Sequence, residues 1–242
     1  MVIRGDAYGM VLYDYHRKGR GDEIVERDDG FMLRTAGVGE LFEDYRHWPS
    51  AERRAMRFAR GRVLDAGCGA GRACLHLQDK GLEVVGIDLS PLAVKVCKER
   101  GVKRCHMVDL RALDDRFGVF DTVLLLGGNV SLLATKSRAS AMLRRLHRLT
   151  SDRARIIATT QDPHLTKDAT HLAYHGRNVE AGQLFGHMRI RDRYRDYASG
   201  WYDFLMLAKH ELEQLLDGSG WRVARFIDAE RGAYVAVIEK SS

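Results

Sequence analysis

The chain has 242 residues and a formal net charge of +6 at pH 7. This length suits one domain with a large hydrophobic core and additional segments around it. No apolar run reaches the roughly 18 to 20 residues of a membrane span. The first ten residues, MVIRGDAYGM, lack the apolar segment of a secretion signal, so we expect a cytoplasmic protein. Basic residues are dispersed rather than gathered in one block, so nucleic acid is a less favoured partner than a small molecule.

Residues 1–61 are expected to form an N-terminal cap belonging to the same domain. Residues 8–15 predict a helix, and EIVER and FMLRT flank the turn sequence Asp28-Asp29-Gly30, which predicts a hairpin. Two more helices are predicted over 40–48 and 50–60, the second ended by Gly61.

The rest of the chain is organised around residues 62–88. Apolar residues 62–66 and 83–87 predict two strands, and residues 72–80 predict the helix between them. Glycines at 67, 69 and 71 remove the Cβ atoms that would keep an adenosine-bearing ligand away from the turn. Asp88, after the second strand, offers a carboxylate that can accept two hydrogen bonds from a ribose diol.

The spacing in VLDAGCGAG is D-x-G-x-G-x-G, with Asp65 first and Arg72 where a dinucleotide-binding fingerprint has its last glycine. This disfavours an NAD-dependent oxidoreductase. With Asp88, the turn resembles the first motif of the class I S-adenosylmethionine (SAM) dependent methyltransferases, and GIDLSP resembles their second. The resemblance implies SAM as cofactor and S-adenosylhomocysteine as product. The cofactor-binding residues that it implies are Asp65, Gly67, Cys68, Gly69, Gly71, Asp88, Leu89, Asp109, Leu110 and Gly127.

The next elements continue the strand–helix alternation. A helix is predicted over 91–100, strands over 103–108 and 120–126, a helix over 137–149 and a strand over 155–160. The family resemblance places Asp109 near the adenine amino group, Leu110 on the adenine ring, and Gly127 beside the methionine part of SAM. A solvated surface position is the alternative for Asp109.

Residues 161–207 separate the fifth strand from a helix predicted at 211–216, and an insertion of this length usually carries function. We expect a β-rich substrate lid, with strands over 183–197 and 201–207. A terminal hairpin follows over 221–229 and 233–239 and is typical of the methyltransferase sheet. The predicted fold is α/β, with a doubly wound, seven-stranded, mostly parallel sheet, an antiparallel terminal hairpin, a cap over 1–61 and a methyltransferase domain over 62–242.

Several lid residues are candidates for catalysis. Asp162, His164 and His175 are the candidate general bases if the acceptor needs one. His171 and His175 have the i, i+4 spacing of two metal ligands, but Gly176 indicates little more than one helical turn there, and we expect no metal site. We expect the four cysteines, at 68, 74, 97 and 105, to be buried reduced thiols because none forms a CxxC pair.

The sequence thus predicts a SAM-dependent methyltransferase with an unidentified acceptor, for which a small molecule is favoured. The alternatives are a methyltransferase acting on RNA and a non-catalytic SAM-binding protein. Arginines at 189, 191, 193 and 195 share one face of a predicted strand, so RNA stays an alternative methyl acceptor. We expect Met188, Ile190 and Tyr194 to form the packed face of the same strand. The methylated atom and the oligomeric state stay open.

Overall fold

The computed structural model describes residues 5–35, 37–133 and 135–241. The chain forms two compact units that interleave along the sequence. The first contains Met1–Trp48, Arg62–Leu113 and Arg189–Tyr202, and the second contains Pro49–Gly61, Asp114–Met188 and Asp203–Ser242. The division into a cap over 1–61, a domain over 62–242 and a lid over 161–207 stays a prediction.

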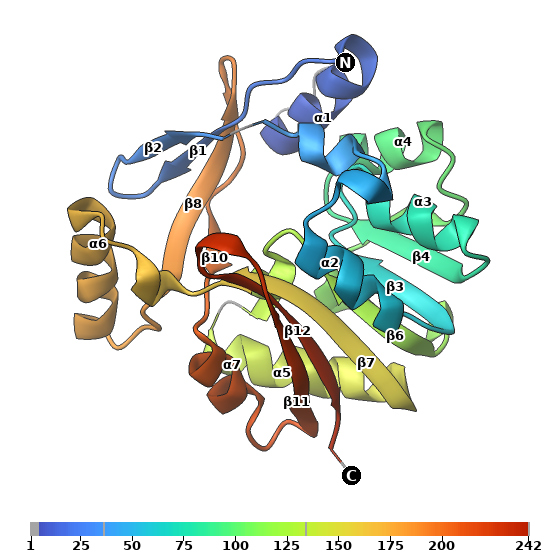
Figure 1. The fold of residues 1–242 in the computed structure, drawn as a ribbon. Coiled ribbons are helices and arrows are strands. Elements are labelled where there is room, and N and C mark those ends of the chain that lie inside the picture. The colour runs from blue at the N-terminus through green and yellow to red at the C-terminus, as the bar shows by residue number, and fades with distance from the viewer. Residues whose placement is uncertain (1–4, 36, 134, 242) are drawn as a thin grey trace. The chain divides into compact units, whose positions relative to one another are not determined.

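The first unit contains the strand–helix alternation predicted around the glycine-rich turn. Its elements are β3 (Arg62–Ala66), α3 (Arg72–Asp79), β4 (Glu83–Asp88), α4 (Pro91–Glu99) and β5 (Cys105–Met107). β4 pairs in parallel with both β3 and β5, and the middle of β3 and β4 is buried, as expected for strands covered on both faces. Ser90 caps α4 by accepting a 2.9 Å hydrogen bond from the Ala93 N–H. Figure 1 shows α3 and α4 against this part of the sheet.

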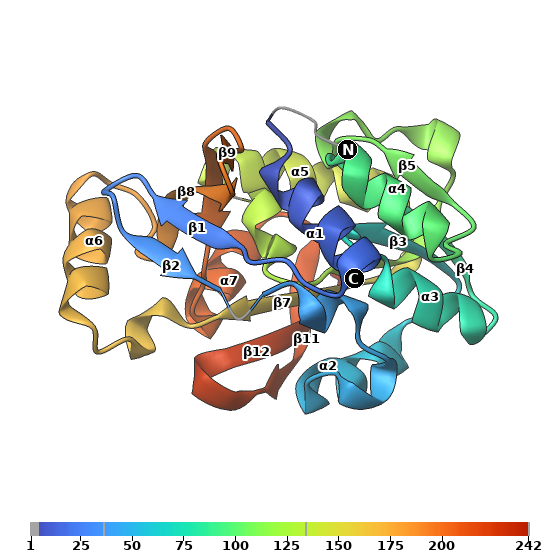
Figure 2. The same cartoon turned by 90° about the horizontal axis from the view of Figure 1, so that it is seen from above.

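Helix α1 (Ala7–Lys18) is anchored to α4 by one carboxylate. Asp6 accepts a hydrogen bond from the Gly9 N–H at 3.0 Å, which caps α1, and others from Ser90 Oγ at 2.9 Å and the Leu92 N–H at 3.3 Å. Gly9 permits this approach, because a Cβ there would lie 2.1 Å from Ser90 Oγ. Apolar residues of α1 and α4 share one buried cluster, and the two helices lie side by side in Figure 2.

A second, five-stranded sheet includes the hairpin predicted near the N-terminus. Its strands are β1 (Ile24–Arg27), β2 (Met32–Arg34), β8 (His187–Tyr194), β9 (Tyr197–Ala198) and β10 (Tyr202–Leu205), in the order β10-β8-β1-β2 with β9 beside β8. The predicted alternation along β8 is confirmed: Ile190 and Tyr194 are buried, and Met188 is half-buried. Arg191 and Arg193 are not simply solvated, because both pair with Glu26 of β1, at 2.8 and 2.7 Å.

The second unit contains the remaining strands and helices of the main sheet. They are α2 (Ser50–Ala55), β6 (Phe120–Leu125), α5 (Lys136–Arg148), β7 (Thr150–Gln161), α6 (Ala169–Glu180), α7 (Lys209–Leu216), β11 (Trp221–Asp228) and β12 (Ala233–Lys240). β6 and β7 are parallel, and β12 is antiparallel to both β7 and β11.

The seven-stranded sheet has the order β11-β12-β7-β6-β3-β4-β5. The predicted terminal hairpin places its last strand, β12, between β7 and β11. This arrangement confirms the predicted α/β fold with a mostly parallel sheet and an antiparallel terminal hairpin. Among the residues that the structure describes, no helix has the length and apolarity needed to cross a membrane.

Two helix predictions were wrong. Residues 40–48 form two 3-10 turns, η1 (Gly39–Phe42) and η2 (Tyr45–His47), because Glu43 is extended and its carbonyl accepts a 2.9 Å hydrogen bond from Trp48 Nε1. Conversely, the histidine-rich part of the insertion forms the 12-residue helix α6, where little more than one turn was predicted. The Asp168 carboxylate caps α6 by accepting hydrogen bonds from the N–H groups of Thr170 and His171.

Candidate functional site

The turn after β3 has the geometry of a ligand cradle. Gly67, Gly69 and Gly71 all have positive φ, at 76°, 53° and 78°, a region that side chains other than glycine rarely adopt. At Gly71 a Cβ would also meet Val102 and Cys97 at 2.7 and 2.9 Å, so glycine is needed there for packing. At Gly69 a Cβ would have one neighbour within 4 Å, the Tyr8 hydroxyl at 3.2 Å. The sequence could not predict that the α1 tyrosine would lie beside this turn.

Asp88 joins the turn to the end of β4. One carboxylate oxygen accepts a hydrogen bond from the Gly69 N–H and the other from the Ser90 N–H, both at 2.9 Å. Burial raises the pKa of Asp88 to about 6, and these two hydrogen bonds oppose the rise. A carboxylate has about four acceptor positions, so two are left for a ribose diol. The cradle therefore fits an adenosine ligand.

The other predicted cofactor residues of the first unit differ in their surroundings. Asp65 is buried, accepts a 3.2 Å hydrogen bond from the Cys74 thiol, and has its pKa raised to about 6 by burial. Asp109 caps a short 3-10 turn and binds the Arg111 guanidinium, whose hydrogen bonds lower the Asp109 pKa. Leu110 is buried and Leu89 is exposed. An adenine amino group would thus have to share the Asp109 carboxylate with Arg111.

Besides Asp88, two acidic groups that the sequence did not identify lie near Tyr8, the half-buried Glu23 and the buried Asp192. Burial, followed by the charges of Asp88, Glu23 and Asp192, raises the pKa of Tyr8 well above its ordinary value. Asp192 is 6% exposed, accepts a 2.8 Å hydrogen bond from the Tyr202 hydroxyl, and has its pKa raised mainly by burial. Burial and the charge of Asp192 also raise the pKa of Glu23. In the part of the chain that the structure describes, neither Glu23 nor Asp192 forms a salt bridge.

In the second unit, Gly127 follows β6 and has a φ of 64°. The next residue, Gly128, lies against Phe204, because a Cβ at Gly128 would be 2.9 Å from that ring. Ser131 fastens the same segments together: its hydroxyl donates to the Gly128 carbonyl at 2.6 Å and accepts from the Leu205 N–H at 3.0 Å. The predicted methionine-side turn is therefore packed against the end of the insertion.

A histidine beside this turn was not among the predicted candidates. His187 is 8% exposed, and its Nε2 lies 3.2 Å from the Asp203 carboxylate, which also binds Arg138. Its Nδ1 is buried without a hydrogen-bond partner in the described part of the chain. The sequence offered only a weak signal, since His187 and Asp203 are 16 residues apart on two strands.

The predicted general-base candidates serve structural roles in this structure. Asp162 accepts a 2.9 Å hydrogen bond from the His164 N–H in a short 3-10 turn. His164 stacks on Phe185 at 4.1 Å and contacts Glu211 at 3.3 Å, and His175, buried on α6, lies 4.7 Å from the same ring. Their catalytic role stays a prediction.

Possible metal-ligand clusters differ from the predicted histidine pair. Within the described ranges, two groups of three potential ligands have their atoms within 4.8 Å of one another: Cys68, Cys97 and Cys105, and His164, His210 and Glu211. His171 and His175 belong to neither group.

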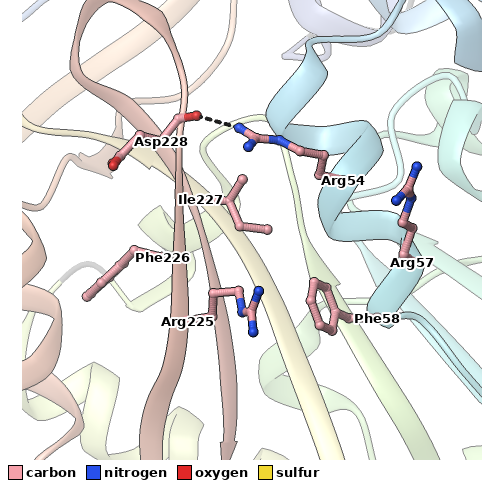
Figure 3. A pocket seen from close by; sticks show the side chains of 7 residues that line it. All are labelled: Arg54, Arg57, Phe58, Arg225, Phe226, Ile227 and Asp228. Atoms are coloured by element: carbon pink, nitrogen blue, oxygen red, sulfur yellow. Dashed lines mark hydrogen bonds between the residues drawn. The ribbon is translucent and has the colours of Figure 1, made fainter.

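A hollow of about 420 Å³ lies between α2 and β11 of the second unit (Figure 3). Its lining residues are Arg54, Arg57, Phe58, Arg225, Phe226, Ile227 and Asp228. Arg54 reaches across it to donate a 3.0 Å hydrogen bond to the Asp228 carbonyl. None of the predicted site residues lines this hollow.

A family model described as a methyltransferase domain matches residues 63–153. The chain is similar in structure to a SAM-dependent methyltransferase from Bacteroides fragilis that was solved in complex with S-adenosyl-L-homocysteine. That protein is 26% identical, with a TM-score of 0.84, over 100% of this chain and 98% of the other.

Two curated relatives match over shorter stretches. The putative methyltransferase YqeM of Bacillus subtilis is 32% identical over 82 residues, covering 32% of this chain and 33% of that protein. Magnesium-protoporphyrin O-methyltransferase of Rhodobacter capsulatus is 36% identical over 69 residues, covering 26% of this chain and 30% of that protein. The chain thus spans about a third of the length of these curated relatives. With the glycine-rich turn, Asp88 and the seven-stranded sheet already described, these similarities show a methyltransferase domain over residues 63–153 and the fold of the class I SAM-dependent methyltransferases.

Proposed function

We propose that this chain transfers the methyl group of SAM to a small-molecule acceptor. The observation that carries the proposal is the cradle made by Gly69, Asp88 and Tyr8, in which backbone, carboxylate and hydroxyl converge on one turn. The cofactor-binding residues that we propose are Asp65, Gly67, Cys68, Gly69, Gly71, Asp88, Leu89, Asp109, Leu110 and Gly127.

Each part of the cradle has a separate role in the proposal. The Asp88 carboxylate holds the turn through the Gly69 N–H and uses its remaining lone pairs for the ribose hydroxyls. Asp65 acts indirectly, since it is buried and fixes the start of the turn through Cys74. The shape of the turn at Gly69 lets the ligand contact the backbone.

SAM supplies an electrophilic methyl group when bound, so this chain must mainly orient the acceptor and exclude water. Orientation of this kind contributes up to roughly 7 to 11 kcal/mol to a reaction barrier. An acceptor that is protonated at neutral pH also needs a base. Asp192 and Glu23 suit that task, because burial raises their pKa values and so makes the carboxylates more basic.

An amine is the acceptor class that these residues favour. A buried carboxylate without a cationic partner costs folding free energy, and both Glu23 and Asp192 lack a salt bridge among the described residues. A protonated amine would supply the missing charge and could then lose its proton to the carboxylate. The magnesium-protoporphyrin relative acts, by its name, on a small molecule, which supports the size of the acceptor but not its reacting atom.

Other functions have less support. An RNA platform on β8 would need free arginines, yet Arg191 and Arg193 bind Glu26, and Arg195 binds Asp14. The buried, polar surroundings of Tyr8 also favour turnover over a non-catalytic SAM-binding role. We propose a cytoplasmic location because the four cysteines are free thiols, as is typical of reducing compartments.

The test is incubation of the purified protein with methyl-labelled SAM and a cell extract separated into metabolite, RNA and protein pools. We expect label in amine-containing metabolites, with none in an extract treated to acetylate its amines. Label confined to RNA or protein would contradict the small-molecule proposal. Calorimetry should show binding of SAM and S-adenosylhomocysteine but not of NADH, and failure to bind SAM would refute the proposed function as a whole.

A further inference from the structure

Three thiols from three different elements converge beneath the glycine-rich turn. Cys68 belongs to the turn itself, Cys97 to α4 and Cys105 to β5, and these residues are 8%, 0% and 3% exposed. The Cys68 sulfur lies 3.7 Å from the sulfur of Cys97 and 3.7 Å from that of Cys105. All three sulfur atoms lie within 4.8 Å of one another. Sequence spacing gave no sign of this cluster, since its members are separated by 29 and 37 residues.

These separations exclude a disulfide, and they fit metal-bound thiolates as well as hydrogen-bonded thiols. A disulfide joins sulfur atoms at about 2.05 Å. Sulfurs that share one tetrahedral ion at about 2.3 Å are about 3.8 Å apart, as simple geometry requires. The two measured distances of 3.7 Å are close to this value. An ion could therefore bind all three sulfurs with little movement of the turn, α4 or β5.

We propose that Cys68, Cys97 and Cys105 form a binding site for one thiophilic divalent ion of the zinc and cadmium class. Sulfur is a soft ligand that selects such ions, whereas Mg²⁺ and Ca²⁺ require oxygen ligands that this cluster does not offer. The site differs from the cofactor cradle, although Cys68 belongs to both, and it does not depend on the proposed methyltransferase activity.

The surroundings of the cluster suit the charge of such a complex. Binding replaces three S–H protons with three metal–sulfur bonds, so three protons are released and the complex carries one negative charge. Groups of both signs face the cluster: Lys98 and His106 lie near Cys105 and Arg100 near Cys97, whereas the carboxyl groups of Asp65 and Asp88 also lie near Cys105. Lys98 and Arg100 would offset part of the negative charge, as surrounding residues commonly do at metal sites.

The fourth cysteine gives a matched control. A Cβ at Gly86 would lie 3.0 Å from the sulfurs of both Cys68 and Cys74, so Cys74 lies beside the cluster. Its thiol instead donates to the Asp65 carboxylate at 3.2 Å. Cys74→Ser keeps a donor for Asp65, and Cys97→Ser keeps a donor for the Gly69 carbonyl, which Cys97 contacts at 3.1 Å. The two variants therefore differ mainly in whether the proposed ligand set is intact.

The test is titration of the reduced, metal-free protein with Cd²⁺, followed by thiolate-to-cadmium absorption in the ultraviolet and by calorimetry. We expect one ion per chain, proton release seen as a dependence of the heat on buffer ionisation, and competition by an excess of Zn²⁺ but not of Mg²⁺. Cys97→Ser should weaken Cd²⁺ binding by at least about tenfold, and Cys74→Ser should stay within about threefold of the unmodified protein, given the usual 10- to 100-fold effect of changes around metal sites.

Cys105→Ala removes a different one of the three proposed metal ligands and replaces Cys97→Ser in the test if that variant folds poorly. Circular dichroism shows whether each variant is folded. Absence of the charge-transfer absorption in the folded, reduced protein would overturn the proposal. Equal affinity in the Cys97→Ser, Cys105→Ala and Cys74→Ser proteins would overturn it as well, because binding would then be independent of the three thiols. SAM affinity, measured separately, reports on the proposed function and does not enter this result.

Discussion

Replacement of Asp88 by asparagine should weaken SAM binding without lowering the stability of the fold. The folded pKa of Asp88 is about 6, against an ordinary value of 3.8. At 1.36 kcal/mol per pKa unit, the ionised carboxylate costs the folded state about 3 kcal/mol at neutral pH. Because the folded pKa is the higher one, this cost is present above about pH 6 and disappears as the pH falls towards 3.8. Asp88→Asn removes this charge, which offsets the loss of one of the two hydrogen bonds from Gly69 and Ser90, since the amide has a single acceptor oxygen.

We therefore expect Asp88→Asn to unfold at the same or a higher denaturant concentration, with a stability gain of up to about 2 kcal/mol after the lost hydrogen bond is subtracted. SAM affinity should fall by about 1.5 to 3 kcal/mol, the range of hydrogen bonds to a charged group. Calorimetry measures the affinity and urea unfolding the stability. Asp79→Asn is the control, since Asp79 is an exposed aspartate at the end of α3. Unchanged SAM affinity in folded Asp88→Asn would refute the ribose role and the reasoning from the turn.

Three more predictions concern the same unit. SAM affinity should weaken as the pH falls below about 6, because the ribose hydroxyls need the ionised Asp88; a flat calorimetric profile from pH 5 to 8 would contradict this. Gly69→Val should abolish SAM binding and largely keep the circular dichroism spectrum, because a side chain at φ 53° would face the ligand and the Tyr8 hydroxyl. Wild-type SAM affinity in this variant would show that the turn does not face the ligand. Arg191→Glu should lower the urea midpoint, because it sets two carboxylates against each other at Glu26. Glu26→Arg combined with Arg191→Glu should recover part of the loss, and no recovery would show that the ion pair does not stabilise the sheet.

The sequence predicted best those elements whose pattern is local. β3 was predicted with its observed bounds, and the terminal hairpin differed by one residue at the end of each strand. Both have nearly continuous apolar residues and are bounded by glycine or by turn residues, so no distant contact was needed to identify them.

Helix α6 shows where local reasoning failed. Gly176 was interpreted as the end of a short turn, yet a glycine inside a helix costs only about 1 kcal/mol relative to alanine. The Asp168 cap and the burial of Tyr174, His175 and Asn178 offset that cost. The strength of these tertiary contacts cannot be read from the sequence of the helix.

The sequence predicted only those site residues that lie in motifs close together along the chain. Gly69 and Asp88 were found because they sit in recognisable motifs 19 residues apart. Tyr8, Glu23 and Asp192 were missed because they come from α1, from just before β1, and from β8, and each looks ordinary in its own segment. Asp192 interrupts the apolar face of β8, which was the one available signal.

The shared carboxylate of Asp6 has a consequence for the newly made chain. Asp6 and helix α1 are synthesised before α4, because Ser90, which binds Asp6 and caps α4, is made 84 residues later. At translation rates of about 5 to 20 residues per second, α1 must wait roughly 4 to 17 s for its binding surface. During that interval Met10, Val11 and Leu12, which are buried in the finished protein, are exposed. Helix α1 of the nascent chain is therefore a natural target for chaperones, and a translational pause before α4 would prolong that exposure.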